Sequence, residues 1–130
     1  MKITMHGNPL TLVGTPIKTG ETAPVFYGIN QQMQPVSLKE FAGKVVVISS
    51  FPSIDTPVCS AQMHHFNKMA SELSQDVVIL AISCDLPFAL HRYCAAEGID
   101  RVVTLSDYKE TDFGNFEYKN YEELKNNPYY

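Results

Sequence analysis

The chain has 130 residues, of which 45% are hydrophobic and 18% charged, and its formal net charge is -4 at pH 7. This length fits one domain, over residues 1–130, and the acidic balance without a basic cluster argues against nucleic-acid and membrane-surface partners. No apolar run approaches the roughly 20 residues of a membrane span, and the first residues lack the apolar core of a signal peptide, so we expect a cytoplasmic protein.

The first half of the chain predicts short strands and one short helix. Residues 2–13 indicate a β-hairpin around Gly7, residues 14–24 an irregular connection and residues 25–29 a short strand. Ser37 and Glu40 have the spacing of a capping box, which predicts a short helix over residues 37–42. The β-branched run over residues 44–50 is typical of a strand that is buried on both faces of a sheet.

The second half alternates helices and strands. A helix is predicted over residues 58–73, with one apolar face made by Met63, Phe66, Ala70 and Leu73. A buried strand follows over residues 77–82. A second helix runs from Pro87, with Asp85 as its cap, to Gly98, and a strand over residues 101–105 comes next. This order predicts an α/β fold with βαβ units and a parallel sheet component.

The most informative motif follows the strand over residues 44–50. Pro52, Thr56 and Cys59 stand in the order P-x-x-x-T-x-x-C, which places Cys59 at the start of a helix. The positive end of a helix dipole favours a thiolate, and the thiolate is the nucleophilic form of cysteine. In this arrangement the Thr56 hydroxyl can lie beside the sulfur and Pro52 can wall off one side of the pocket. The alternative is that Cys59 is a small buried hydrophobe.

Together with Ser53-Ile-Asp-Thr56, Asp85-Leu-Pro-Phe-Ala89 and Arg92-Tyr-Cys94, this motif resembles the bacterial thiol peroxidases, which are atypical two-cysteine peroxiredoxins. The resemblance implies a thioredoxin-like fold with an N-terminal β-hairpin and a central mixed sheet flanked by helices. It also implies that Cys59 attacks a hydroperoxide substrate, with Pro52 and Thr56 in the same site. Cys94 would resolve the oxidised Cys59 through an intrachain disulfide, which a thioredoxin-type reductant reduces. A homodimer without cofactor or metal is the implied form.

Several other residues receive non-catalytic interpretations. Cys84 is expected to be a packed thiol at the end of a strand, and a buried helix cysteine remains the alternative for Cys94. His64 and His65 are adjacent on a helix and point about 100° apart, so we expect solvated side chains rather than metal ligands. Ser60, Gln62 and Asn67 are expected on the helix surface.

The resemblance runs to about Gly114 and then fails. The family continues with a strand that carries the active-site arginine and with an antiparallel partner strand, whereas residues 115–130 contain no arginine. The C-terminal strands are therefore expected to be incomplete. Two interpretations remain open: the chain lacks a segment of a longer protein, or it is a shortened version whose sheet has an exposed edge.

Two rival functions follow from these features. A thiol-disulfide carrier without peroxidase activity would normally use a C-x-x-C pair, which this sequence does not contain. A shortened, non-catalytic interaction domain is favoured by the loss of the arginine strand. We expect a thiol-dependent peroxidase, and peroxide-dependent loss of thiol distinguishes it from both rivals.

Overall fold

The computed structural model describes residues 2–11 and 15–109 of the chain. The chain divides into two compact units, of which the larger spans Val25–Phe113. That a single domain covers residues 1–130 stays a prediction. Within the described residues, no helix is long and apolar enough to cross a membrane.

The N-terminal segment forms the predicted hairpin. Strands β1 (Ile3–Met5) and β2 (Asn8–Leu10) pair antiparallel, with Ile3 opposite Leu10. The two residues between the strands, His6 and Gly7, both have positive φ angles, 49° and 82°. A two-residue hairpin turn with positive φ at both positions matches the right-handed twist of its strands, which explains why a glycine stands here.

The larger unit is built on a mixed sheet of five strands in the order β4-β3-β7-β6-β5. The parallel part consists of β5 (Val45–Ser50), β6 (Val77–Ser83) and β7 (Val103–Ser106). Strand β3 (Tyr27–Ile29) runs antiparallel to both β7 and β4 (Pro35–Ser37). This arrangement confirms the predicted α/β fold with βαβ units.

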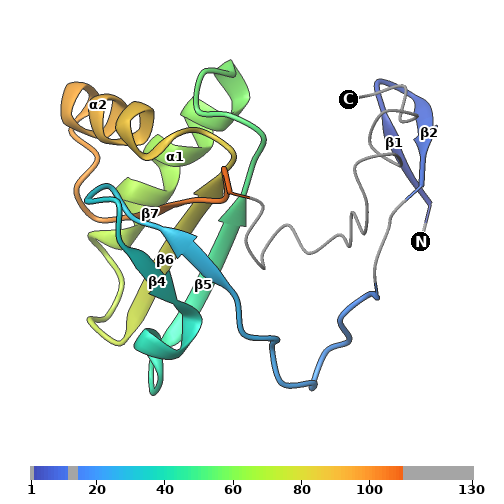
Figure 1. Cartoon of the computed structure of the whole chain (residues 1–130), viewed down its shortest axis with the longest axis horizontal. Helices are drawn as coiled ribbons and strands as arrows, with labels where there is room; N and C mark the ends of the chain where they lie inside the picture. Colours follow the sequence, from blue (N-terminus) through green and yellow to red (C-terminus); the bar gives the residue numbers. More distant parts are fainter. Residues whose placement is uncertain (1, 12–14, 110–130) are drawn as a thin grey trace. The chain divides into compact units, whose positions relative to one another are not determined.

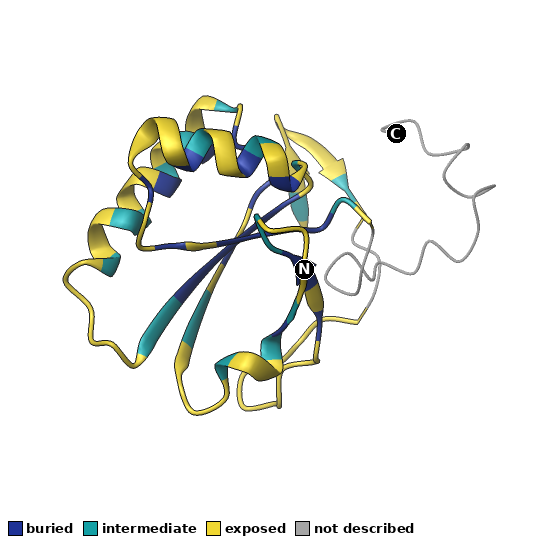
Figure 2. Ribbon diagram, turned by 60° about the vertical axis from the view of Figure 1, so that its left-hand side comes forward, coloured by how far each residue is buried: buried dark blue, intermediate teal, exposed yellow. Residues whose placement is uncertain are grey.

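Two helices, α1 (Pro57–Ala70) and α2 (Pro87–Glu97), cover one face of this sheet (Figure 1). Both helices enter one buried cluster with the strand residues Ile79 and Ala81. The opposite face buries Leu80 and Leu105 beneath Phe26 and the 3-10 helix η1 (Leu38–Phe41). Figure 2 shows the buried residues along the sheet and on the helix faces that pack against it.

Three local features differ from the sequence expectations. Strand β4 was not predicted. Strand β5 is not buried on both faces, because Val45 and Ile48 are 62% and 41% exposed, and within residues 25–109 β5 pairs with β6 alone. Helix α1 ends at Ala70, so Leu73 lies beyond it and is 39% exposed. The expected incompleteness of the C-terminal strands concerns residues 110–130, which lie outside the described residues.

Candidate active site

Cys59 lies in the first turn of α1, as the motif predicts. Thr56 is the N-cap, and Pro57 occupies the first helical position, where its missing N–H costs no hydrogen bond. The Thr56 hydroxyl oxygen accepts a hydrogen bond from the backbone N–H of Cys59 at 3.3 Å. The side chain of Cys59 is only 7% exposed and belongs to the buried cluster beneath the helices. The thiol therefore sits at the positive end of the helix and away from bulk water.

The hydroxyl group of Thr56 makes a different contact from the one expected. It donates to the carbonyl oxygen of Ser53 at 3.2 Å, so its single hydrogen is directed at the loop rather than at the sulfur. Thr56 therefore fixes the helix start that carries Cys59. Pro52 is exposed in the same loop, and its part in shielding the sulfur stays a prediction.

The second predicted cysteine, Cys94, faces the same buried cluster from α2 and is 6% exposed. Burial raises the pKa of the Cys94 thiol above its ordinary value, while hydrogen bonds from Gln31 and Thr104 partly oppose this rise. Gln31 also donates to the Thr104 hydroxyl at 2.7 Å. Burial thus favours the neutral thiol form of Cys94, which has two polar neighbours. Cys59, Cys84 and Cys94 form no disulfide with one another.

Polar contacts set the register between the two helices that carry these cysteines. Ser60 bonds to Tyr93 at 2.6 Å, His64 to Glu97 at 3.0 Å, and Asn67 to the backbone of Asp100 at 3.2 Å, each pair being 33 residues apart. Equal separations mean that α1 and α2 run parallel. Cys59 and Cys94 are 35 residues apart, so at about 1.5 Å per residue their levels along the helices differ by about 3 Å.

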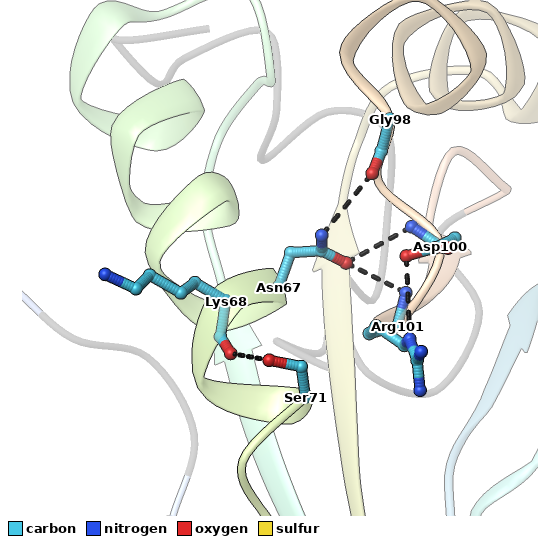
Figure 3. Close-up of polar contacts among 6 residues, drawn as sticks. All are labelled: Asn67, Lys68, Ser71, Gly98, Asp100 and Arg101. Atoms are coloured by element: carbon cyan, nitrogen blue, oxygen red, sulfur yellow. Dashed lines mark hydrogen bonds and ion pairs between the residues drawn. The ribbon is translucent and has the colours of Figure 1, made fainter.

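Asn67 holds the far end of this pair of helices (Figure 3). Its amide oxygen accepts from the backbone N–H groups of Asp100 and Arg101, and its amide nitrogen donates to the carbonyl of Gly98. Gly98 adopts a left-handed conformation, φ 67°, as the predicted helix end requires. Ser60 and Asn67 were expected to be ordinary surface residues. Ser60 instead bonds α1 to α2, and Asn67 bonds α1 to the segment that follows α2. Gln62 likewise donates to Ser49 of β5.

Cys84 and the two histidines were expected to have no catalytic role, although His64 takes part in the contacts between the helices. Cys84 follows β6 and is exposed, so the expectation of a packed thiol is wrong. His64 is about half exposed, and His65 is exposed, as expected for solvated helix histidines. Within the described part of the chain, no group of three or more histidine, cysteine or acidic side chains could hold a metal ion.

The prediction that Asp85 caps α2 is wrong. The N-cap residue is Leu86, which makes no side-chain cap bond. The Asp85 carboxylate instead accepts hydrogen bonds from the Ser53 hydroxyl and the Ile54 N–H, both at 2.7 Å. The motifs that contain Ser53 and Asp85 are both recognisable in the sequence, but the contact between them is not, because it spans 32 residues.

The fold and the pair of buried cysteines on adjacent helices define a thiol-based redox protein of the thioredoxin-like class.

Comparisons with known proteins identify the family. The redoxin family model matches residues 18–118. Thiol peroxidases from Listeria monocytogenes serotype 4b and Bacillus subtilis are each 49% identical over 113 residues, which cover 87% of this chain and 68% and 67% of those proteins. A peroxiredoxin-like protein from Aquifex aeolicus has a solved structure with a TM-score of 0.77 at 34% identity, over 83% of this chain and 63% of that one.

The chain therefore belongs to the redoxin family and, within it, to the bacterial thiol peroxidases. It spans about two thirds of the length of the curated relatives that it matches, and less than two thirds of the Aquifex aeolicus chain.

Proposed function

We propose that this chain reduces hydroperoxides, with Cys59 as the attacking thiol and Cys94 as the resolving thiol. The observation that carries the proposal is the placement of Cys59 in the first turn of α1, behind the Thr56 cap and in one buried cluster with Cys94. A helix start favours the thiolate, which is the nucleophilic form of cysteine.

The reaction balances in one oxidation, one condensation and one reduction. The Cys59 thiolate attacks the distal oxygen of the hydroperoxide, the O–O bond breaks, and the leaving alkoxide takes a proton to become alcohol or water. The sulfur is left as a sulfenic acid. Cys94 then attacks this sulfur, an S–S bond forms and water leaves. A thioredoxin-type dithiol reduces the disulfide by thiol-disulfide exchange and is itself oxidised.

The helix register supports this pairing of cysteines. Packed helices lie about 8–10 Å apart at their axes, whereas a disulfide needs Cα atoms within about 7 Å. Because the two cysteines differ by only about 3 Å in level, unwinding the first turn of α1 is enough to bring Cys59 to α2. The Ser60–Tyr93 contact breaks in this movement, while the Asn67 contacts at the far end hold the helices in register.

The experiment that tests this proposal is thiol loss on addition of a small alkyl hydroperoxide. Cys59→Ser abolishes hydroperoxide consumption, and the matched change Cys84→Ser at an exposed cysteine leaves the rate nearly unchanged. Oxidation of Cys59 no faster than that of a free cysteine would instead favour a non-catalytic interaction domain, and slow oxidation would favour a thiol-disulfide carrier.

A cytoplasmic location and a homodimer complete the proposal. Three cysteines at uneven spacing do not form a structural disulfide scaffold, which suits a reducing compartment. Exposed apolar side chains near the starts of both helices, Val58 at 76% and Phe88 at 65%, support contact with a second copy. Sedimentation of the reduced chain tests the dimer, and a concentration-independent monomer contradicts it.

A further inference from the structure

The carboxylate of Asp85, between β6 and α2, accepts three hydrogen bonds. One carboxylate oxygen accepts from the Ser53 hydroxyl at 2.7 Å. The other accepts from the Ile54 N–H at 2.7 Å and from the Ser83 hydroxyl at 2.8 Å. No helix cap and no ion pair uses this carboxylate among the described residues. Its bonds therefore serve the loop in front of α1.

These bonds continue to the site of Cys59. Ser53, held by Asp85, offers its carbonyl oxygen to both the N–H and the hydroxyl of Thr56, each at 3.2 Å. Thr56 in turn accepts from the Cys59 N–H. Ile54, the second residue held by Asp85, is 1% exposed and lies in the same buried cluster as Cys59. A continuous chain of contacts thus joins Asp85 to the first turn of α1.

Asp85 is itself fixed to the carboxyl ends of two interior strands of the sheet. Its backbone N–H donates to the Ser83 hydroxyl at the end of β6, and its carbonyl oxygen accepts from the Ser106 hydroxyl at the end of β7. Two residues later, Pro87 begins α2, the helix of Cys94. The carboxylate therefore ties the mobile partner in the proposed reaction, the start of α1, to the part of the fold that carries the resolving cysteine.

We propose that Asp85 is a positioning residue that anchors the Cys59 loop in its peroxide-reactive arrangement and must release it before the disulfide forms. This inference rests on the proposed function. The Asp85 bonds stabilise the state in which the first turn of α1 is folded, and they do not stabilise the state in which it is unwound. Loss of these bonds therefore lowers the population of the folded, peroxide-reactive state and raises the population of the unwound state. Removing the carboxylate therefore slows the attack on peroxide and does not slow disulfide formation.

Two variants of Asp85 separate anchoring from other effects. Asp85→Ala removes all three side-chain bonds. Asp85→Asn keeps one oxygen for Ile54 and Ser83 and places its amide nitrogen against Ser53, whose hydroxyl can turn to accept instead of donate. We expect the rate of sulfenic acid formation to fall roughly tenfold to a hundredfold in Asp85→Ala and by less than about threefold in Asp85→Asn. The matched control is Asp76→Ala, an exposed aspartate before the opposite end of β6.

The two steps are measured separately by rapid quenching and mass spectrometry. Sulfenic acid formation is followed with Cys94→Ser present, and disulfide formation with Cys94 intact. The anchoring role is refuted if Asp85→Ala forms sulfenic acid as fast as the control does. It is also refuted if disulfide formation in Asp85→Ala is slowed as much as sulfenic acid formation.

Amide hydrogen exchange over residues 53–59 gives a readout that needs no peroxidase activity. Exchange there rises in Asp85→Ala and stays at the level of the unsubstituted chain in Asp76→Ala. An unchanged exchange profile in Asp85→Ala would show that Asp85 does not anchor the loop. If the control variant does not react with peroxide, the proposed function is refuted, but hydrogen exchange still tests whether Asp85 anchors the loop. If Asp85→Ala does not fold, Ser53→Ala, which removes one of the three bonds to the Asp85 carboxylate together with the bond from the Asp55 N–H, shows the same rise in smaller measure.

Discussion

The N-cap of α1, Thr56, bonds directly to the backbone of Cys59. Thr56→Val tests whether this cap holds the first turn of the helix in place. Valine keeps the shape of threonine but can neither accept from the Cys59 N–H nor donate to the Ser53 carbonyl. Loss of an N-cap costs about 0.5–2 kcal/mol, and loss of an ordinary hydrogen bond about 0.5–1.5 kcal/mol. Because Thr56 is only half-buried, water recovers part of this. We expect a loss of about 1–2 kcal/mol in the free energy of unfolding.

The same change frees the first turn of α1, which carries Cys59. We expect the second-order rate with peroxide to fall roughly fivefold to thirtyfold, since each 1.4 kcal/mol is about tenfold. Thr56→Ser keeps both hydrogen bonds and most of the rate. Denaturant titration and stopped-flow measurement of peroxide loss give the two quantities.

A matched control lies at the other end of the same helix. Ser71 donates to the carbonyl oxygen of Lys68 at 2.6 Å, so Ser71→Ala also weakens α1 by one contact but leaves the turn of Cys59 intact (Figure 3). It lowers stability without lowering the rate. A full rate in Thr56→Val, or an equal loss of rate in Ser71→Ala, refutes the reasoning.

Three further changes probe the scaffold. A Cβ at Gly28 would lie 2.8 Å from the Cβ of the fully buried Leu105, so Gly28→Ala costs about 1–3 kcal/mol, and an unchanged melting temperature contradicts that close approach. Asn67→Ala removes three hydrogen bonds to residues 98–101 and lowers the free energy of unfolding by about 1–2 kcal/mol, whereas Asn67→Asp keeps the two hydrogen bonds that the side-chain oxygen accepts. Equal free energies of unfolding for the two variants would argue against these contacts. Burial raises the pKa of Cys94, so the folded chain holds the thiol proton more tightly than the unfolded chain, and stability falls as the pH rises past 9.0, the ordinary pKa of the thiol. Cys94→Ala removes this dependence of stability on pH, and an unaltered pH profile would show that Cys94 does not cause it.

Local chemistry made the start of α1 predictable from sequence. Thr56 has a side chain that caps helices and Pro57 suits the first helical position, so the order of residues alone places Cys59 in the first turn. The capping box of Ser37 and Glu40 was predictable for the same reason, and both of its hydrogen bonds are present. These features depend on residues within a few positions of one another.

Features that depend on distant contacts were missed or misread. Asp85 has the residue type and position of a helix cap, but its partners Ser53 and Ile54 stand 32 and 31 residues earlier in the chain. The β-branched run of β5 indicates a strand but carries no information on its place in the sheet, and Val45 is exposed. Strand β4 begins at Pro35, a residue that argues against a strand in a sequence pattern, and it forms by pairing with β3.

The most direct test of the Cys59–Cys94 chemistry is the intact mass of the chain after one equivalent of hydroperoxide, followed by peptide mapping without reductant. We predict a monomer lighter by two hydrogen atoms, with one disulfide joining the peptides of Cys59 and Cys94. In Cys94→Ser the chain should instead gain one oxygen atom, as a sulfenic acid at Cys59. A disulfide to Cys84, a disulfide only between two copies of Cys59, or an unchanged mass would contradict the roles given to these two cysteines.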